Sequence, residues 1–253
     1  MATNPRPRIA IPMPHSIDRE YAERAIPQYE RAVEQAGGEP VRIPLDQASA
    51  EAMKLDVLKI MESCDGVLLP GSKADVEPSK FGAPRSPHTA PADPRRDAVD
   101  ELLLQDAYNR RKPVLGICYG LQSLNVFRAG SLIQHIPDFL SEDLRTKINH
   151  EAGKKVAVAH TVEIENDSKL EDILGRSDKR MIQVNSSHHQ SADVIGDGLQ
   201  IAARCPDDGI IEALEGTASD HFVLAVQWHP ERSVDQDKPS RAIFRALIQA
   251  ARQ

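Results

Sequence analysis

The sequence predicts an α/β protein with a mostly parallel central sheet flanked by helices. Short apolar runs alternate along the chain with longer segments of helical periodicity, which is typical of repeated βαβ units. One apolar run, within residues 113–122, ends at a cysteine that stands between two glycines. A chain of 253 residues can bury a sizeable core. We see no internal repeat and no linker, so we expect residues 1–253 to form a single domain.

The N-terminal part of the chain supplies the first strands and helices of this pattern. Pro27 suits the first position of a helix, and the glycine pair that begins at Gly37 supplies its stop. The apolar runs that precede and follow this helix end at proline or glycine, as buried strands often do. We expect strands at 8–13, 41–44 and 66–69 and helices at 27–36, 50–63 and 97–111.

A proline-rich segment, 72–97, breaks this rhythm. It has little apolar content, and we expect a long loop. The segment leaves the carboxyl end of the strand at 66–69 and returns, through the helix at 97–111, to the strand that carries Cys118. Ligands of open α/β sheets bind beyond the carboxyl ends of the strands, so we expect this loop beside the site. Whether it acts as a lid is an open question at this stage.

The stretch around Cys118 has the form of a nucleophile elbow, a sharp turn from a strand into a helix. Gly116 and Gly120 flank the cysteine, where a β-carbon would crowd the backbone, and a helix is expected at 121–127. The positive end of that helix would favour a thiolate. Our interpretation is that Cys118 is a catalytic nucleophile, with a buried structural cysteine as the alternative on local grounds.

The C-terminal half predicts further strands and offers a base for this nucleophile. The apolar strand expected at 222–227 is followed directly by Trp228-His229-Pro230-Glu231. His229 and Glu231 would lie at the carboxyl end of that strand, on the same rim as Cys118, as a base and the group that orients it. The remaining elements are strands at 155–164, 181–184, 199–204 and 210–214 and a helix at 240–251.

Composition excludes several classes of partner and site. The formal charge is 31 − 38 = −7, and no long basic run is present, which argues against nucleic acid and anionic membranes as partners. No apolar stretch is long enough for a membrane span, and the N-terminus lacks the apolar core of a secretory signal. Three widely spaced cysteines form neither a disulfide framework nor a CxxC metal site, so we expect a cytoplasmic protein.

The motifs together resemble those of a known superfamily. The stretch 116–122, taken with His229-Pro230-Glu231, resembles the class I glutamine amidotransferases. Four further stretches resemble the standalone peptidase C26 branch, which includes γ-glutamyl-γ-aminobutyrate hydrolase; they are 69–78, 93–97, 185–190 and 226–231. The resemblance implies a flavodoxin-like sheet and a cysteine-histidine-glutamate triad.

The resemblance also implies a role for each matching residue. Cys118 would attack the γ-carbonyl of a γ-glutamyl amide, His229 would move the protons, and Glu231 would hold the imidazole. A glutamyl thioester would form, and water would release glutamate. The backbone N–H groups of Gly71 and Tyr119 would stabilise the oxyanion. Because these donors belong to the main chain, we expect the Tyr119 side chain to matter little.

Substrate-binding residues are expected near the elbow, and metals and cofactors are not expected. Gln122 matches a family glutamine that fixes the γ-glutamyl group, and Ser187, His188 and His189 are expected to line the site. Neighbouring side chains on a strand point to opposite sides, so at most one of the two histidines should face the cleft. A deaminase-like zinc site would need a later P-C-x-x-C motif, and no cysteine follows Cys205.

These inferences predict a cysteine-dependent hydrolase of γ-glutamyl amides that acts on a small-molecule substrate. Two alternatives are kept: a glutaminase subunit that supplies ammonia to a separate synthetase, and a non-catalytic binding protein on the same fold. The leaving amine and the oligomeric state are left open by the sequence, with a homodimer as one alternative.

Overall fold

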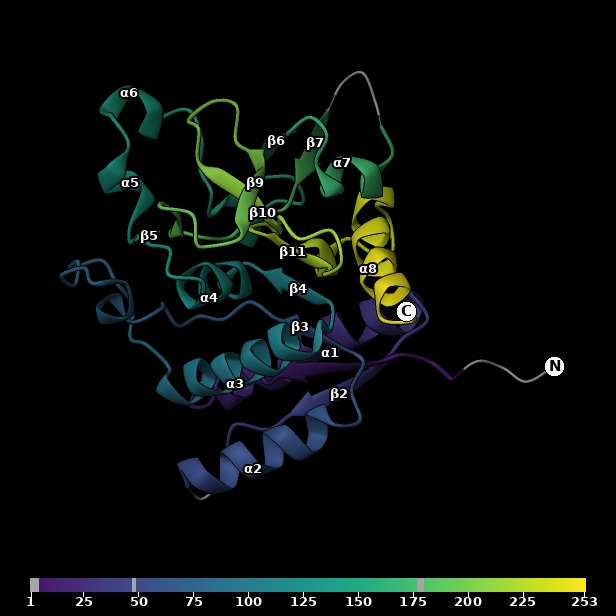
Figure 1. The fold of residues 1–253 in the computed structure, drawn as a ribbon. Coiled ribbons are helices and arrows are strands. Elements are labelled where there is room, and N and C mark those ends of the chain that lie inside the picture. The colour runs from purple at the N-terminus through teal and green to yellow at the C-terminus, as the bar shows by residue number, and fades with distance from the viewer. Residues whose placement is uncertain (1–4, 47–48, 177–179) are drawn as a thin grey trace.

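A nine-stranded mixed sheet runs through the computed structural model, which describes residues 5–46, 49–176 and 180–253 (Figure 1). The strand order is β2-β1-β3-β4-β11-β10-β9-β6-β7. The predicted α/β class, with a large central sheet between helices, is confirmed. Within the described ranges, no helix has the length and apolar character needed to cross a membrane.

One half of the sheet is parallel. Its four pairings, from β2 across to β11, all run in the same direction. Strands β3, β4 and β11 are buried along their whole length, as parallel strands covered by helices on both faces must be. The strands of this half are β1 (Arg8–Pro12), β2 (Glu39–Ile43), β3 (Gly66–Leu69), β4 (Val114–Ile117) and β11 (Val223–Val226).

The other half of the sheet is antiparallel. Each pairing from β11 to β7 reverses direction, and a separate two-stranded sheet lies beside this half. All strands expected in the C-terminal half are present, although β6 begins five residues later than the predicted start at 155. The strands are β10 (Ile211–Gly216), β9 (Leu199–Arg204), β6 (His160–Ile164), β7 (Met181–Val184), β5 (Leu132–Ile133) and β8 (Ser191–Ala192).

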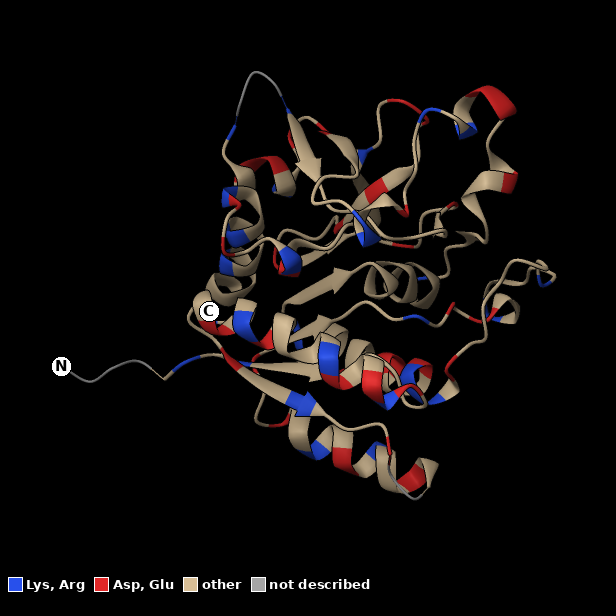
Figure 2. Ribbon diagram, turned by 180° about the vertical axis from the view of Figure 1, so that it is seen from behind, with Lys and Arg blue, Asp and Glu red and all other residues tan. Residues whose placement is uncertain are grey.

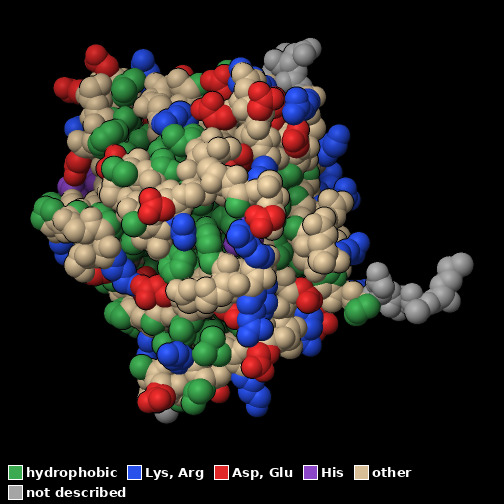
Figure 3. All heavy atoms as spheres, viewed as in Figure 1, with side chains coloured by type: hydrophobic (Ala, Val, Ile, Leu, Met, Phe, Trp, Pro, Cys, Tyr) green, Lys and Arg blue, Asp and Glu red, His purple; other side chains and the backbone are tan. Residues whose placement is uncertain are grey.

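Helices cover both faces of the sheet. Helices α1, α7 and α8 share one apolar core with the sheet, and α2, α3 and α4 share the other. Acidic and basic residues alternate along α2 and α3 in Figure 2, and both signs mix over the surface in Figure 3. The helices are α1 (Arg19–Gln35), α2 (Ala50–Met61), α3 (Pro94–Arg110), α4 (Tyr119–Phe127), α5 (Ile136–Phe139), α6 (Glu142–Arg145), α7 (Lys169–Leu174) and α8 (Lys238–Ala250), with 3-10 turns η1 (Pro78–Phe81), η2 (Ala152–Lys154) and η3 (Pro230–Arg232).

Four helices begin earlier than the sequence predicts: α4 and α8 by two residues each, and α1 and α3 by more. Helix α1 begins at Arg19, because Asp18 caps it by accepting a hydrogen bond of 3.0 Å from the Tyr21 N–H. Pro27 lies inside this helix and not at its start, with its ring on the exposed face. Helix α3 begins at Pro94, so the last residues of the predicted 72–97 loop are helical.

The first turns of α3 hold the strand ends that surround the site. The fully buried guanidinium of Arg96 donates to Asp100 at 2.6 Å, to the Pro14 carbonyl at 3.1 Å and to the Pro70 carbonyl at 2.7 Å. Pro14 and Pro70 follow β1 and β3, so one side chain ties two strand ends to α3. A charge-assisted network of this kind fixes the backbone that leads into Gly71.

Candidate functional site

Cys118 lies at the turn between β4 and α4, in a strained conformation. Its φ is +53° and its ψ is −105°, a combination that L-residues rarely adopt outside functional turns. The Cys118 N–H donates to the Val226 carbonyl at 2.8 Å, and its own carbonyl accepts from the Leu121 N–H at 3.0 Å. The turn is therefore anchored to the neighbouring strand on one side and to the helix on the other.

The flanking glycines are required by close packing at this turn. A β-carbon on Gly116 would lie 2.7 Å from the Gly120 carbonyl oxygen, inside van der Waals contact. A β-carbon on Gly120 would overlap the Leu69 carbonyl oxygen at the end of β3. The elbow expected from the sequence thus has a steric cause: strand β3, strand β4 and the first turn of α4 approach within backbone contact.

His229 and Glu231 lie just beyond the end of β11. The His229 N–H donates to the Asn185 carbonyl at 2.9 Å, and Pro230 opens the 3-10 turn η3 that carries Glu231. The His229 Nδ1 lies 2.7 Å from a Glu231 carboxylate oxygen, and both side chains are buried. The short turn therefore sets the imidazole against the carboxylate.

Cys118 and His229 meet beside Gly71. A β-carbon on Gly71 would lie 3.0 Å from His229 Cε1 and 3.6 Å from Cys118 Cβ. The structure thus brings together the ends of three parallel strands, β3, β4 and β11, with the thiol, the imidazole and a backbone N–H at one point. This is the rim on which the sequence placed them.

The electrostatics of this group favour a charged imidazole. Burial disfavours the imidazolium, but the Glu231 carboxylate and the Cys118 sulfur outweigh it and raise the pKa of His229 to about 9. Burial also acts to raise the pKa of Glu231, yet the imidazole and the Arg232 guanidinium hold it below its usual range. An imidazolium between a carboxylate and a sulfur can stabilise negative charge on Cys118 and later give up a proton.

A cavity of about 590 Å³ opens onto Cys118 and His229. Its charged lining is mainly basic, which suits a substrate that carries carboxylates. The charged residues are Arg24, Lys73, Lys154 and Arg232 against Asp75 and Glu151. Gln122 and Ser187 also line the cavity, and the Gln122 side-chain amide donates to the Gln190 carbonyl at 3.2 Å.

The two adjacent histidines border this cavity with different orientations. Both follow β7 and lie outside the strand. The His189 imidazole is partly exposed and lies 3.0 Å from an Asp75 oxygen, whereas the His188 imidazole is buried and has its nitrogens toward the Gln190 carbonyl and Glu212. Of the two rings, His189 is therefore the one placed to meet a ligand.

The predicted oxyanion donors differ in their surroundings. The Gly71 N–H donates to the hydroxyl of Tyr29 at 3.1 Å, so this donor has a partner in the free protein. The Tyr119 hydroxyl donates to Asp97, and the Arg96 guanidinium lies 4.9 Å from the ring centroid. The Tyr119 side chain is thus a buried structural anchor, a role separate from the main-chain donor that the sequence analysis considered.

Sequence reasoning missed Tyr29 and Asp75 as parts of the site. Tyr29 lies on the buried face of α1, and a phenol on an apolar helix face is the one sequence signal that marks it. Asp75 accepts from the Ala90 N–H at 2.7 Å and contacts His189, so it ties the proline-rich segment to the residues after β7.

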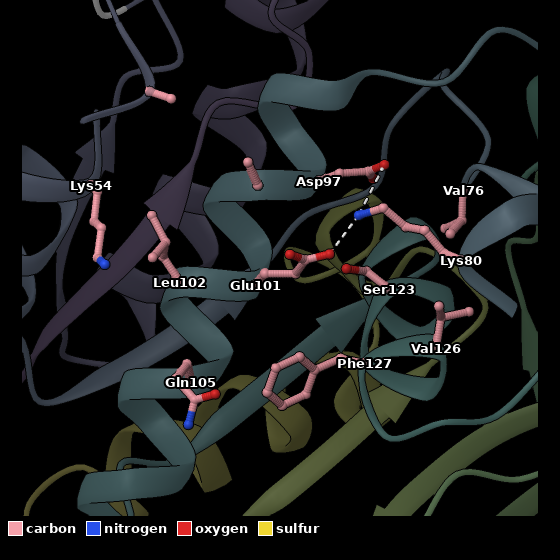
Figure 4. Close-up of a pocket in the computed structure, with 12 residues that line it drawn as sticks. Lys54, Val76, Lys80, Asp97, Glu101, Leu102, Gln105, Ser123, Val126 and Phe127 are labelled. Atoms are coloured by element: carbon pink, nitrogen blue, oxygen red, sulfur yellow. Dashed lines mark hydrogen bonds and ion pairs between the residues drawn. The ribbon is translucent and has the colours of Figure 1, made fainter. Parts of the chain in front are cut away.

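A second cavity, of about 620 Å³, lies between α3 and α4 (Figure 4). The Lys80 ammonium reaches into it and pairs with Glu101 at 2.5 Å and Asp97 at 3.4 Å. With Lys54, the lining carries two cations against two carboxylates, so its formal charge is balanced. The lining residues include none of those predicted for catalysis, as far as the described chain shows. The groups able to do acyl-transfer chemistry gather around the other cavity.

Known proteins resemble this chain over most of its length. Residues 11–231 match the peptidase C26 family. A protein of Mycobacterium tuberculosis, provisionally named a glutamine amidotransferase, is 37% identical over 88% of this chain and 66% of its own length. The γ-glutamyl-γ-aminobutyrate hydrolase PuuD of Escherichia coli K12 is 34% identical over 88% of this chain and 84% of its own length.

Solved structures share the fold at low sequence identity. PurLQS from Thermotoga maritima matches with a TM-score of 0.59 and 19% identity, over 96% of this chain and 98% of the other. A protein from Thermoplasma acidophilum, provisionally named a GMP synthase subunit, matches with a TM-score of 0.60 and 15% identity, over 99% and 96%. The predicted amidotransferase fold is thereby confirmed. On the match over 11–231 and the identities to its relatives, the chain belongs to the peptidase C26 family.

Proposed function

We propose that this protein hydrolyses γ-glutamyl amides through a glutamyl thioester on Cys118. The observation that carries the proposal is the buried His229–Glu231 hydrogen bond of 2.7 Å beside a cysteine held in a strained strand-to-helix turn. A nucleophile, a base and a group that orients the base are the minimum required for covalent acyl transfer. Membership of a family that includes γ-glutamyl-γ-aminobutyrate hydrolases supports the same reaction class.

The reaction proceeds by two acyl transfers. His229 takes the proton of the Cys118 thiol, and the sulfur attacks the γ-carbonyl carbon to form a C–S bond. The tetrahedral intermediate collapses, the C–N bond breaks, and the His229 imidazolium gives its proton to the departing amine. Water, deprotonated by His229, then attacks the thioester and releases glutamate. The proton returns to the sulfur, and the enzyme is restored.

Glu231 keeps His229 in the required state throughout. Its carboxylate accepts the Nδ1 hydrogen, which leaves Nε2 for proton transfer and stabilises the imidazolium that forms. The raised pKa of His229 is the electrostatic signature of this role.

The oxyanion is stabilised by the backbone N–H groups of Gly71 and Tyr119. Each such donor is worth on the order of 2.7–4 kcal/mol in the transition state. In the free protein the Tyr29 hydroxyl accepts the hydrogen bond that the Gly71 N–H donates. The substrate oxygen therefore replaces this phenol, which keeps a buried donor paired until substrate arrives.

The cavity favours a substrate with an excess of carboxylates. γ-Glutamyl-γ-aminobutyrate carries two carboxylates and one ammonium, and the basic residues of the lining outnumber the acidic ones. Gln122 lies beside Cys118 on the first turns of α4, where its amide can contact the γ-glutamyl group. Ser187 and His189 also line the cavity and bind the rest of the substrate.

The test is to incubate the purified protein alone with γ-glutamyl-γ-aminobutyrate and, separately, with glutamine, and to measure released glutamate. We expect turnover of the γ-glutamyl amide without a partner protein. Turnover of glutamine that requires an added synthetase would instead support a glutaminase subunit. No turnover of any γ-glutamyl compound by folded protein would contradict hydrolysis and favour a binding protein.

A further inference from the structure

A second buried group of titratable side chains lies outside the proposed machinery. Three imidazoles surround the Glu212 carboxylate on β10, and all four side chains are almost fully buried. They come from separate segments: the chain before η2, the start of β6 and the chain after β7. The distances to Glu212 Oε1 are 3.1 Å from His150 Nδ1, 3.3 Å from His160 Nε2 and 3.5 Å from His188 Nε2.

These atoms are at ion-pair distance, but none of the three ring nitrogens is well aligned for a hydrogen bond to the carboxylate. The three ring nitrogens and both Glu212 oxygens are buried without a hydrogen-bond partner. Such atoms are rare in folded proteins, because a buried polar group that loses water without gaining a partner is destabilising. The rings are therefore not directed along the lines to the carboxylate oxygen. This arrangement is expected when the three ring nitrogens and the Glu212 oxygen all face one shared centre.

The opposite nitrogen of each ring is held by an outer acceptor. These contacts are His150 Nε2 to Asp208 at 2.8 Å, His160 Nδ1 to the Thr161 carbonyl at 3.1 Å and His188 Nδ1 to the Gln190 carbonyl at 2.9 Å. A carbonyl can only accept, so His160 and His188 carry hydrogen on the outer nitrogen. A neutral ring of this tautomer presents a lone pair to the cluster, as metal-binding histidines do.

The spacing suits a tetrahedral ion. With Zn–N and Zn–O bonds of about 2.0–2.2 Å, the edge of a tetrahedral site measures roughly 3.3–3.5 Å. The three separations from Glu212 Oε1 span 3.1–3.5 Å, and all four ligand atoms lie within 4.8 Å of one another. We propose a structural Zn²⁺ site whose ligands are His150, His160, His188 and Glu212. The sequence predicted no metal, because these positions share no spacing pattern.

Four protein ligands close the site to water, so its role is structural. The ion joins three segments at the antiparallel end of the sheet, one of which borders the catalytic cavity through His188. His188 also holds the Gln190 carbonyl, which accepts from Gln122. Zinc would thus fix the wall of the cavity without contact with the reacting atoms.

Metal analysis of the full-length, untagged protein tests the proposal. Protein stripped with a chelator is dialysed against Zn²⁺, and the bound metal is measured by mass spectrometry. We expect one Zn²⁺ per chain, lost in Glu212→Gln and in His160→Gln. His221→Gln is the matched control, because His221 is a buried histidine whose ring instead contacts the Lys112 carbonyl at 2.8 Å. Asp208→Asn, which alters only an outer acceptor, should weaken Zn²⁺ affinity about 10- to 100-fold.

Co²⁺ binding to the wild-type protein supplies a second measurement, which is informative even if the variants do not fold. Co²⁺ added to the stripped wild-type protein should give the intense visible absorption of a tetrahedral ion, and Zn²⁺ should abolish it. Wild-type protein that stays folded but binds neither ion would overturn the site, as would equal zinc content in the cluster variants and the His221 control. Those results would mean that protonated imidazoles paired with Glu212, and not a metal ion, hold the cluster together.

Discussion

Two buried histidine–glutamate assemblies in this protein have opposite designs. In the first, His229 and Glu231 stand two residues apart and share one hydrogen bond of 2.7 Å, while Cys118 also contacts the imidazole. In the second, three imidazoles surround Glu212 at 3.1–3.5 Å, and none is well aligned for a hydrogen bond to it. In the first assembly, one ring binds the carboxylate through one nitrogen, which leaves its other nitrogen for proton transfer. In the second, all three outer nitrogens are already bound, and His160 and His188, whose outer partners are carbonyls, direct their remaining lone pairs toward Glu212, where we propose the cation.

The largest expected effect removes the nucleophile of the first assembly. Cys118→Ala should lower kcat/KM for a γ-glutamyl amide by a factor on the order of 10⁶, because members of a catalytic triad act as a unit. Circular dichroism and the thermal unfolding curve should be unchanged in shape. Cys64→Ala is the matched control, since Cys64 is also buried but lies among core residues away from the site. Equal losses in the two variants would contradict the assignment.

Removing the orienting carboxylate should be the next largest effect. Glu231→Gln should lower kcat/KM by about 10⁴-fold. The pH profile should change as well. His229 has a pKa raised to about 9, so activity of the wild type should fall as pH rises through that value and the imidazolium is lost. Without the Glu231 charge this pKa decreases, so the alkaline limb should move to lower pH. A limb that stays near pH 9 would show that another group sets it.

The same substitution in the second assembly should act on stability. Glu212→Gln removes the carboxylate shared by three buried imidazoles and should lower the free energy of unfolding by about 3–5 kcal/mol. Urea unfolding at fixed zinc concentration measures this loss. The alkaline limb of kcat/KM should stay near pH 9, because Glu212 is not a partner of His229. A shifted limb with unchanged stability would reverse the two roles.

The smallest expected effect concerns the phenol at the oxyanion site. Tyr29→Phe removes one buried hydrogen bond to the Gly71 N–H and should cost about 0.5–1.5 kcal/mol of stability. The value of kcat/KM should stay within about threefold, because the backbone N–H is the proposed donor. A loss of two orders of magnitude in kcat would instead make the Tyr29 hydroxyl the oxyanion donor.

The residues of the first assembly can be proposed from the sequence because their signals are local. The glycines beside Cys118 and the HPE tripeptide after an apolar run are short motifs, and parallel strands bring their ends to one rim. The predicted start of α1 was wrong. Proline is favoured at the first position of a helix, but it is also tolerated at an exposed position inside one, where Pro27 lies. Helices α5 and α6 are too short to show periodicity.

The second assembly lay beyond sequence reasoning for a physical reason. Its residues are separated by ten or more positions and meet only in the antiparallel half of the sheet, where β6 pairs with β7 and is separated from β10 by β9. The orientation of His188 was equally hidden. It depends on a backbone path outside the strand, where the alternation of side chains no longer applies.

The most direct test of the account is to look for the glutamyl group on Cys118. The protein is mixed with γ-glutamyl-γ-aminobutyrate, quenched in acid during turnover and digested for mass spectrometry. We predict that the peptide containing Cys118 gains the mass of one glutamate less water, that hydroxylamine removes this mass, and that Cys118→Ala shows neither adduct nor turnover. Sustained hydrolysis by Cys118→Ala would contradict the central claim.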